Sequence, residues 1–312
     1  MPAKIVVVGS SNVDYIMQVE RLPAPGETVG DAVFMQTYGG KGANQATAAA
    51  RAVGQVTFIA GLGDDAPGRT MRENFQRDGI LTDYALTATG IPSGSALILF
   101  DRNGDNIIAV APGANYALTP EHIESCADII GQAEIVILQM EIPAQVIART
   151  LDIAAEKGVR TLLNYAPVRN LEIAITDKIG VLIVNETEAE ALTGIAVQTT
   201  GQAETSAREL LRRGPKIVAL TLGAAGAFVV SEDFAELIPA FLVTPVDTTA
   251  AGDTFCGAFA VALAEGKSLP DAARFANAAS ALSVTQRGAQ PSIPRRKEIE
   301  ILGVRCSGVQ VF

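Results

Sequence analysis

Short apolar runs alternate with amphipathic segments along most of this chain. The run from Lys4 to Gly9 is almost wholly apolar and ends in glycine, which is typical of a strand buried on both faces of a sheet. The alternation predicts a three-layer α/β sandwich, with a mostly parallel central sheet and helices on both faces. Strands are expected at 4–9, 56–60, 134–139, 160–164, 180–184, 216–222, 226–231 and 235–238, and helices at 42–53, 67–77, 120–131, 143–157, 186–193, 201–213, 253–265 and 270–286.

Extended segments interrupt this rhythm in the first third of the chain. Four more exposed strands are expected, at 13–20, 28–37, 95–101 and 106–110. Asn103 and Gly104 lie between the last two, and Asn-Gly between apolar strands is a strong signal of a β-hairpin. We interpret the segments at about 13–37 and 95–110 as a small antiparallel β lid. The lid would belong to a single domain of residues 1–312.

Composition and charge narrow the possible partners. The chain is 48% hydrophobic, and 24 basic against 34 acidic residues give a net charge of −10. Its longest basic cluster is Arg295-Arg296-Lys297, so nucleic acid is not expected as a partner. No apolar run approaches the ~20 residues of a membrane span, and no signal peptide is expected. Three scattered cysteines without a C-x-x-C motif favour a reducing compartment, so we expect a cytoplasmic protein.

The most informative stretch for chemistry is 247–257. Its small residues at 250–252 allow a ligand to approach the backbone, and Asp253 opens an apolar run that reads as a helix. The N-terminus of a helix suits a phosphate, and a carboxylate there can take a proton from a hydroxyl. Proton chemistry is expected to fall to carboxylates, because His122 is the only histidine. The alternative for Asp253 is a helix N-cap.

Two other segments carry groups suited to hydroxyl-bearing ligands. The turn Gly39–Asn44 opens a helix after a strand, and Lys41 and Asn44 supply hydrogen-bond donors. The alternative is a glycine turn with a solvated lysine. Asn12 and Asp14 follow the first strand, where α/β sheets bind ligands. They would bind vicinal hydroxyls or, alternatively, form an Asx turn.

Three further positions remain open between two interpretations. Glu141 follows a strand and is either a ligand-binding carboxylate or a helix-start residue. Asn185 and Glu188 share one helix face, so they would hold a hydrated Mg²⁺ or form a capping box. The segment Thr221–Gly226 would wrap a nucleotide or simply be a turn between two strands.

The order of these motifs resembles that of one enzyme family. Residues 38–46 read Tyr-Gly-Gly-Lys-Gly-Ala-Asn-Gln-Ala, and residues 247–255 read Asp-Thr-Thr-Ala-Ala-Gly-Asp-Thr-Phe. Together with Asn185 and Glu188, they resemble the signatures of the pfkB-type ribokinase family of carbohydrate kinases, over nearly the whole chain. Further matching segments are 22–28, 112–115 and 287–292.

The resemblance implies transfer of a phosphoryl group from ATP to the 5-hydroxyl of D-ribose. It implies that Asp253 is the general base and that Ala250, Ala251 and Gly252 form an anion hole. The implied sugar-binding residues are Asn12, Asp14, Gly40, Lys41, Gly42, Ala43, Asn44 and Glu141, joined by Asp253. The implied nucleotide-binding residues are Asn185, Glu188, Thr221, Leu222, Gly223, Ala224, Ala225, Gly226, Gly252 and Asn277, with Glu188 organising hydrated Mg²⁺.

The resemblance also implies a bound K⁺ and a homodimer formed through the lid. The implied K⁺ positions are Asp247, Thr249, Ser283, Gln286, Gly288 and Ser292. Two positions depart from the family pattern: Asn277 replaces a frequent histidine near the adenine, and Cys256, close to Asp253, is expected to be core packing. Alternatives are a kinase for deoxyribose, fructose or a nucleoside, or a non-catalytic sugar-binding regulator.

Overall fold

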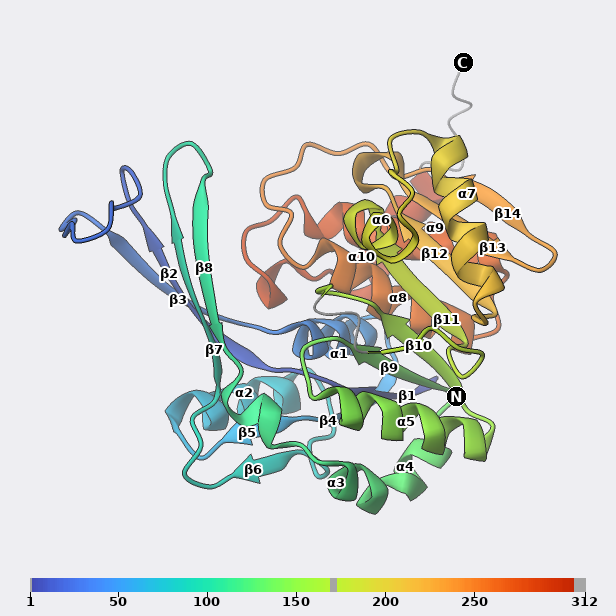
Figure 1. Cartoon of the computed structure of the whole chain (residues 1–312), viewed down its shortest axis with the longest axis horizontal. Helices are drawn as coiled ribbons and strands as arrows, with labels where there is room; N and C mark the ends of the chain where they lie inside the picture. The colour runs from blue at the N-terminus through green and yellow to red at the C-terminus, as the bar shows by residue number, and fades with distance from the viewer. Residues whose placement is uncertain (1, 169–172, 306–312) are drawn as a thin grey trace.

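A twisted eight-stranded sheet forms the middle layer of the molecule, and helices cover both of its faces (Figure 1). The structure is a computed structural model that describes residues 2–168 and 173–305. The strand order is β14-β13-β12-β11-β10-β9-β1-β4; β13 runs antiparallel to both β12 and β14, and all the other pairings are parallel. The predicted three-layer α/β architecture is confirmed.

The elements have the following bounds. The central strands are β1 (Lys4–Val8), β4 (Gln55–Ile59), β9 (Ile135–Gln139), β10 (Arg160–Asn164), β11 (Val181–Asn185), β12 (Ile217–Thr221), β13 (Ala227–Ser231) and β14 (Ala235–Ile238). The helices are α1 (Lys41–Arg51), α2 (Ala66–Arg77), α3 (Pro120–Ser125), α4 (Ala127–Gly131), α5 (Ala144–Lys157), α6 (Glu186–Thr193), α7 (Thr200–Arg212), α8 (Ala251–Ala264), α9 (Leu269–Ser283) and α10 (Arg296–Arg305). Smaller elements are β5 (Gly61–Gly63), β6 (Leu86–Ala88) and the 3₁₀ turns η1 (Gly113–Ala117), η2 (Gly223–Ala225) and η3 (Gln290–Ser292).

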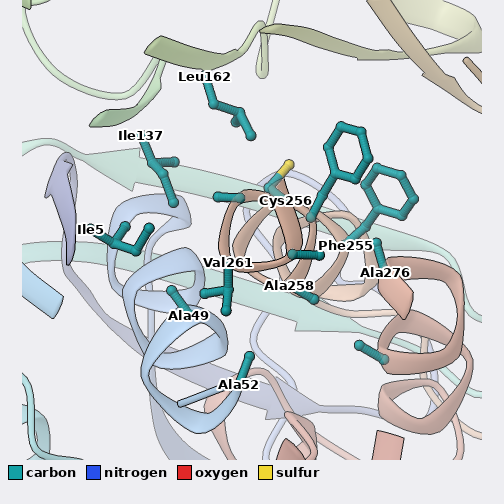
Figure 2. Packing of buried hydrophobic residues seen from close by; sticks show 14 of the residues in the cluster. Ile5, Ala49, Ala52, Ile137, Leu162, Phe255, Cys256, Ala258, Val261 and Ala276 are labelled. Carbon is teal, nitrogen blue, oxygen red and sulfur yellow. The ribbon is translucent and has the colours of Figure 1, made fainter. Parts of the chain in front are cut away.

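The continuous apolar strands are explained by burial on both faces of the sheet. In β1, Ile5 and Val7 pack into one core, whereas Val6 and Val8 pack into the core on the opposite face. Figure 2 shows the first core, where side chains of α1 and α8 meet those of the sheet. The two helices approach closely at Gly257, where an added Cβ would lie 2.6 Å from the Ala48 Cβ. This close approach brings the N-terminal parts of α1 and α8 together.

A second sheet, here called the lid sheet, extends away from the body (Figure 1). Its strands are β2 (Asn12–Gln18), β3 (Val33–Gly39), β7 (Gly94–Phe100) and β8 (Asn106–Ala111), in the order β3-β2-β7-β8. The expected small second sheet is therefore present, with two antiparallel pairs, β2–β3 and β7–β8, and its action as a lid stays a prediction. The two pairs are joined by parallel pairing of β2 with β7.

Some expected boundaries were wrong for identifiable reasons. The strand expected at 28–37 begins only at Val33. The helix expected at 120–131 is two short helices, because the backbone leaves helical geometry at Cys126. The helix expected from Asp253 begins at Ala251. The strands β5 and β6 and the helix α10 were not predicted, and Cys306 lies outside the described residues.

Candidate active site

Asp253 lies in the first turn of α8, a helix that begins directly after a strained residue. Ala250 has φ 60° and ψ 12°, a left-handed conformation that is uncommon for a residue other than glycine. This residue, and not Asp253, is the N-cap, and it makes no side-chain cap hydrogen bond. The N-cap interpretation of Asp253 was therefore wrong. The first N–H groups of a helix have no partner within it, so the Gly252 amide is suited to an anion, whereas Ala251 N donates to Thr248 O at 3.2 Å.

The carboxylate of Asp253 is held by two amides from α1. Asn44 Nδ2 donates to Asp253 Oδ2 at 2.9 Å, and Gln45 Nε2 donates to Asp253 Oδ1 at 2.9 Å. Only 6% of Asp253 is exposed, so these hydrogen bonds compensate for much of the lost hydration. The pKa of Lys41 is raised: burial alone would lower it, but the charges of Asp253, Glu141 and Glu188 outweigh burial. Lys41 is therefore a protonated cation that interacts with the charge of Asp253.

The turn before α1 packs tightly against the end of β1. Glu141 Oε2 accepts hydrogen bonds from Ser10 Oγ at 2.6 Å and from the Lys41 main-chain N at 3.0 Å. Gly42 N donates to Ser10 Oγ at 3.2 Å, and a Cβ at Gly42 would lie 2.5 Å from the Ser10 N. Position 42 must therefore be glycine, because its backbone lies so close to Ser10. The same packing places Glu141 at the start of α1.

Asn12 and Asp14 lie on β2, at the root of the lid sheet. Asn115 Nδ2 donates to Asn12 Oδ1 at 2.8 Å, which fixes the Asn12 amide with its own Nδ2 free to donate elsewhere. Burial, together with the charge of Glu141, raises the pKa of Asp14 to about 7. Asn44 Oδ1 is a buried oxygen that has no hydrogen-bond partner among the described residues. An incoming hydroxyl would satisfy this oxygen.

A cavity of about 340 Å³ opens on the other side of Asp253. Among the expected site residues, its walls include Lys41, Asn185, Glu188, Thr221, Gly223, Gly226, Ala250, Ala251, Gly252, Asp253 and Asn277. Asn12, Asp14, Asn44 and Glu141 are not part of these walls. Asp253 therefore stands between two groups of residues, one in the cavity and one near the lid sheet. The volume is in the range of small-molecule sites.

Asn185 and Glu188 form the capping box at the start of α6. Glu188 N donates to Asn185 Oδ1, and Asn185 N donates to Glu188 Oε2, each at 2.8 Å. Burial raises the pKa of Glu188, although the hydrogen bond from Asn185 opposes it. Because Glu188 also lines the cavity, capping and ligand binding are compatible. Within residues 2–168 and 173–305 there is no cluster of three or more His, Cys, Asp or Glu side chains that would hold a metal. A lone carboxylate fits a hydrated Mg²⁺ that keeps most of its ligands as water and phosphate oxygens.

The segment Thr221–Gly226 is a tight turn between β12 and β13. Leu222 N donates to Gly226 O at 2.8 Å, and both Gly223 and Gly226 have positive φ. Thr221, Gly223 and Gly226 reach the cavity, whereas Leu222, Ala224 and Ala225 are not among its lining residues. The segment is therefore a turn, and nucleotide binding stays a prediction that the cavity supports at three of its six residues.

Asn277 and the expected K⁺ positions lie on and around α9. Asn277 Nδ2 donates to Ile238 O at 2.9 Å and Pro239 O at 3.2 Å, so this amide anchors the end of β14 at the cavity wall. Asp247 Oδ1 accepts from Thr249 N and Oγ1, and Asp247 Oδ2 accepts from Gly288 N. These hydrogen bonds lower the Asp247 pKa against the effect of its burial.

The remaining K⁺ positions are only partly gathered. Asp247 N donates to Val284 O, at the C-terminus of α9, where Ser283 and Gln286 lie. Ser283 Oγ donates to Ser280 O, and Ser292 Oγ donates to Ala289 O. Hydrogen bonds therefore join Asp247 directly to Thr249 and Gly288. The bond from Asp247 N to Val284 O places the C-terminus of α9 beside these three residues.

Comparison with known proteins decides the family. A model of the pfkB family carbohydrate kinases matches residues 2–296. The chain belongs to this family. It is 40% identical to the ribokinase of Haemophilus influenzae over 298 residues, covering 96% of this chain and 97% of that protein. It is 35% identical to the deoxyribokinase of Salmonella typhimurium, covering 93% and 95%.

The similarity extends to a solved structure. The ribokinase of Arabidopsis thaliana complexed with ribose and ATP superimposes with a TM-score of 0.90 at 35% identity. The match covers 97% of this chain and 99% of that chain. The chain is accordingly a carbohydrate kinase of the pfkB family with the ribokinase-like fold.

Sequence reasoning missed several side chains that build the site. They are Ser10, Gln45, Asn115, Gln139 and Asn164. Gln45 lies inside the N-terminal family signature and Asn115 inside the 112–115 match, so a signal was present for these two. For Gln139 and Asn164 the only available sign was a polar residue ending an apolar strand.

Proposed function

We propose that this chain catalyses ATP-dependent phosphorylation of D-ribose at its 5-hydroxyl, giving ribose 5-phosphate and ADP. The observation that carries the proposal is the position of Asp253. Its carboxylate lies between the cavity at the start of α8 and the polar group of Asn12, Asp14, Asn44 and Glu141. A structure of the Arabidopsis thaliana ribokinase is complexed with ribose and ATP, and we assign the sugar of this chain to the polar side and its nucleotide to the cavity.

The chemistry follows from this placement. The sugar 5-hydroxyl gives its proton to Asp253 while its oxygen bonds to the γ-phosphorus, and the bond from that phosphorus to the ADP oxygen breaks. The main-chain N–H of Gly252 stabilises the charge on the transferring group, joined by that of Ala251 when it exchanges its 3.2 Å hydrogen bond to Thr248 O for the ligand, and Lys41 adds a cation beside them. A hydrated Mg²⁺ near Glu188 would supply further neutralisation of the phosphates.

We also propose that K⁺ binds around Asp247, Thr249 and Gly288. The carboxylate of Asp247 is ionised and fixed by three hydrogen bonds, and it lies three residues before Ala250, at the anion hole. A monovalent cation there would hold the strained Ala250 turn in place. Replacing K⁺ by Na⁺ at constant ionic strength is expected to lower kcat severalfold. Equal rates in both salts would remove K⁺ from the proposal.

A homodimer formed through the lid sheet accounts for its exposed apolar residues. The residues include Val33, Phe34, Met35, Leu97, Ile107, Ile108 and Val110, which are 43–59% exposed. Such an extended apolar surface on a sheet away from the body indicates an interface. Two buried free cysteines, Cys126 and Cys256, agree with a reducing compartment such as the cytoplasm. Among the described helices, none has the length and apolar character needed to cross a membrane.

The second candidate substrate is deoxyribose, which the deoxyribokinase relatives support. The decisive experiment measures ADP release with ATP and a panel of D-ribose, 2-deoxy-D-ribose, D-fructose and adenosine. We expect kcat/KM for ribose to exceed that for every other acceptor, because a site built to bind a hydroxyl discriminates against an analogue that lacks it. A higher kcat/KM for deoxyribose would make deoxyribose, and not ribose, the substrate. ADP release that does not depend on any added sugar would contradict the proposed sugar kinase activity.

A further inference from the structure

Gln45 contacts the general base but has no part in the chemistry described above. It lies in the second turn of α1 and is completely buried. Its Nε2 donates to Asp253 Oδ1 at 2.9 Å and to Asn164 Oδ1 at 3.1 Å. Its Oε1 accepts from Gln139 Nε2 at 2.8 Å. Both N–H bonds and the oxygen of this amide are therefore engaged.

Gln139 and Asn164 determine which way the Gln45 amide faces. They are paired residues at the carboxyl ends of β9 and β10. Asn164 Nδ2 donates to Ile183 O at 3.4 Å, which leaves Asn164 Oδ1 to accept from Gln45. If the Gln45 amide were rotated by a half turn, its oxygen would face two other acceptors, Asp253 Oδ1 and Asn164 Oδ1. The network therefore keeps the nitrogen of Gln45 on the base.

This network is not explained by stability alone. Gln139 Oε1 is buried and has no hydrogen-bond partner among the described residues. A buried acceptor left unpaired lowers stability, and an apolar residue at position 139 would avoid that cost. What the Gln139 side chain does provide is the donor that orients Gln45.

The two oxygens of Asp253 are consequently in different surroundings. Oδ1 is held by Gln45, which does not line the cavity. Oδ2 accepts from Asn44, whose own Oδ1 is the buried unpaired oxygen on the sugar side. Oδ2 is therefore the oxygen on the side where a hydroxyl is expected.

We propose that Gln45 is a positioning residue that holds Oδ1 of Asp253 so that Oδ2 receives the proton of the sugar hydroxyl. This inference rests on the proposed function. The O–H proton passes to Oδ2 as the hydroxyl oxygen bonds to phosphorus, and ADP leaves with the electron pair of the broken P–O bond. Because Gln45 touches neither sugar nor nucleotide in this arrangement, it acts on turnover and not on binding.

The main test is a double-mutant cycle between Gln45 and Asp253. Gln45→Met keeps the length of the side chain but removes the amide. We expect kcat to fall by about 10–100-fold, as for a misplaced reacting group, with KM for ribose and for ATP changed less than about threefold. In the Asp253→Asn background, the same substitution should lower kcat by less than about twofold, because the base it positions is gone.

Gln139→Leu supplies a second variant that should not perturb folding. It removes the donor to Gln45 Oε1 together with the unpaired Oε1, and it leaves every direct contact of Asp253 in place. We expect kcat to fall by about 3–10-fold with an unchanged or higher melting temperature, and again no further fall in the Asp253→Asn background. This readout separates positioning from a purely structural role.

The outcomes distinguish this inference from the function on which it rests. If wild-type protein turns over ribose while Gln45→Met and Gln139→Leu stay within twofold of it, the positioning role is wrong and the proposed function stands. An equal fall in the wild-type and Asp253→Asn backgrounds, or a loss confined to KM, also overturns the role of Gln45. A wild-type protein inactive on ribose overturns both.

Discussion

The two sheets of this protein use apolar residues in opposite ways. In the central sheet, strands such as β1 and β9 are buried on both faces by helices of the same chain. In the lid sheet, β8 is exposed at every position although it reads Asn-Ile-Ile-Ala-Val-Ala. The first sheet is complete within one chain, whereas the second presents apolar surface that this chain does not cover.

This difference assigns the proposed phosphoryl transfer and the proposed dimer formation to different parts of the molecule. Asp253, which we propose as the general base, belongs to the body together with its amide partners and the strained Ala250 turn, and packing fixes their positions. The lid sheet contributes Asn12 and Asp14 at its root and apolar strands farther out. We therefore expect changes in the body to affect turnover, and changes in the outer lid sheet to affect association.

The largest effect should come from replacing Asp253, the proposed general base. Asp253→Asn keeps the shape of the side chain but removes the proton acceptor, so kcat should fall by about 10²–10⁴-fold. Steady-state ADP release with ribose measures it, and gel filtration should show the same oligomer as wild type. Near-normal turnover in this variant would place the chemistry elsewhere.

A smaller effect should follow from charging the outer lid sheet. Ile107 and Ile108 point to opposite faces of β8 and are both exposed, so Ile107→Glu with Ile108→Glu places a charge on each face. Burying these charges would weaken a lid dimer by about 100-fold or more in Kd, measurable by sedimentation equilibrium. The matched control is Leu242→Glu, because Leu242 is 98% exposed but lies on the body. A double variant that stays as dimeric as the control would rule out the lid interface.

The smallest effect should come from Asp14, at the root of the lid sheet, as a pH dependence of the free energy of unfolding. The folded pKa of Asp14 is about 7, above its unfolded value of 3.8, so the folded protein holds this proton to higher pH. Its stabilising contribution is therefore complete below about pH 4 and is lost as the pH rises through 7. Asp14→Asn should remove on the order of 2 kcal/mol of this pH dependence.

Urea unfolding at pH 5 and pH 7.5, without ligand, measures the effect at Asp14. Asp64→Asn, at an exposed aspartate of the body, is the control and should retain the wild-type pH dependence. If the free energy of unfolding changed equally between pH 5 and pH 7.5 in wild type, Asp14→Asn and Asp64→Asn, the assignment to Asp14 would be contradicted.

Much of the architecture and of the expected chemistry could be predicted from the sequence. Apolar runs and amphipathic periods identify the strands of the central sheet and most helices, because these patterns record local burial. The two glycine-rich segments and Asp253 indicated phosphoryl transfer, because small residues before a helix expose its amides. The split at Cys126, the start of α8 at Ala251 and the helix α10 were missed, since local backbone geometry and distant packing determine them.

The sequence by itself determined the types of its elements, their approximate order and the kinds of polar group near a ligand. Only the tertiary structure decided that Gln45 meets Asp253, 208 residues away, and that Gln139 and Asn164 turn its amide toward the base. It likewise decided the parallel pairing of β2 with β7 and the exposure of the lid sheet. The reason is physical: such contacts depend on how closely distant helices and strands pack, and no local propensity encodes that distance.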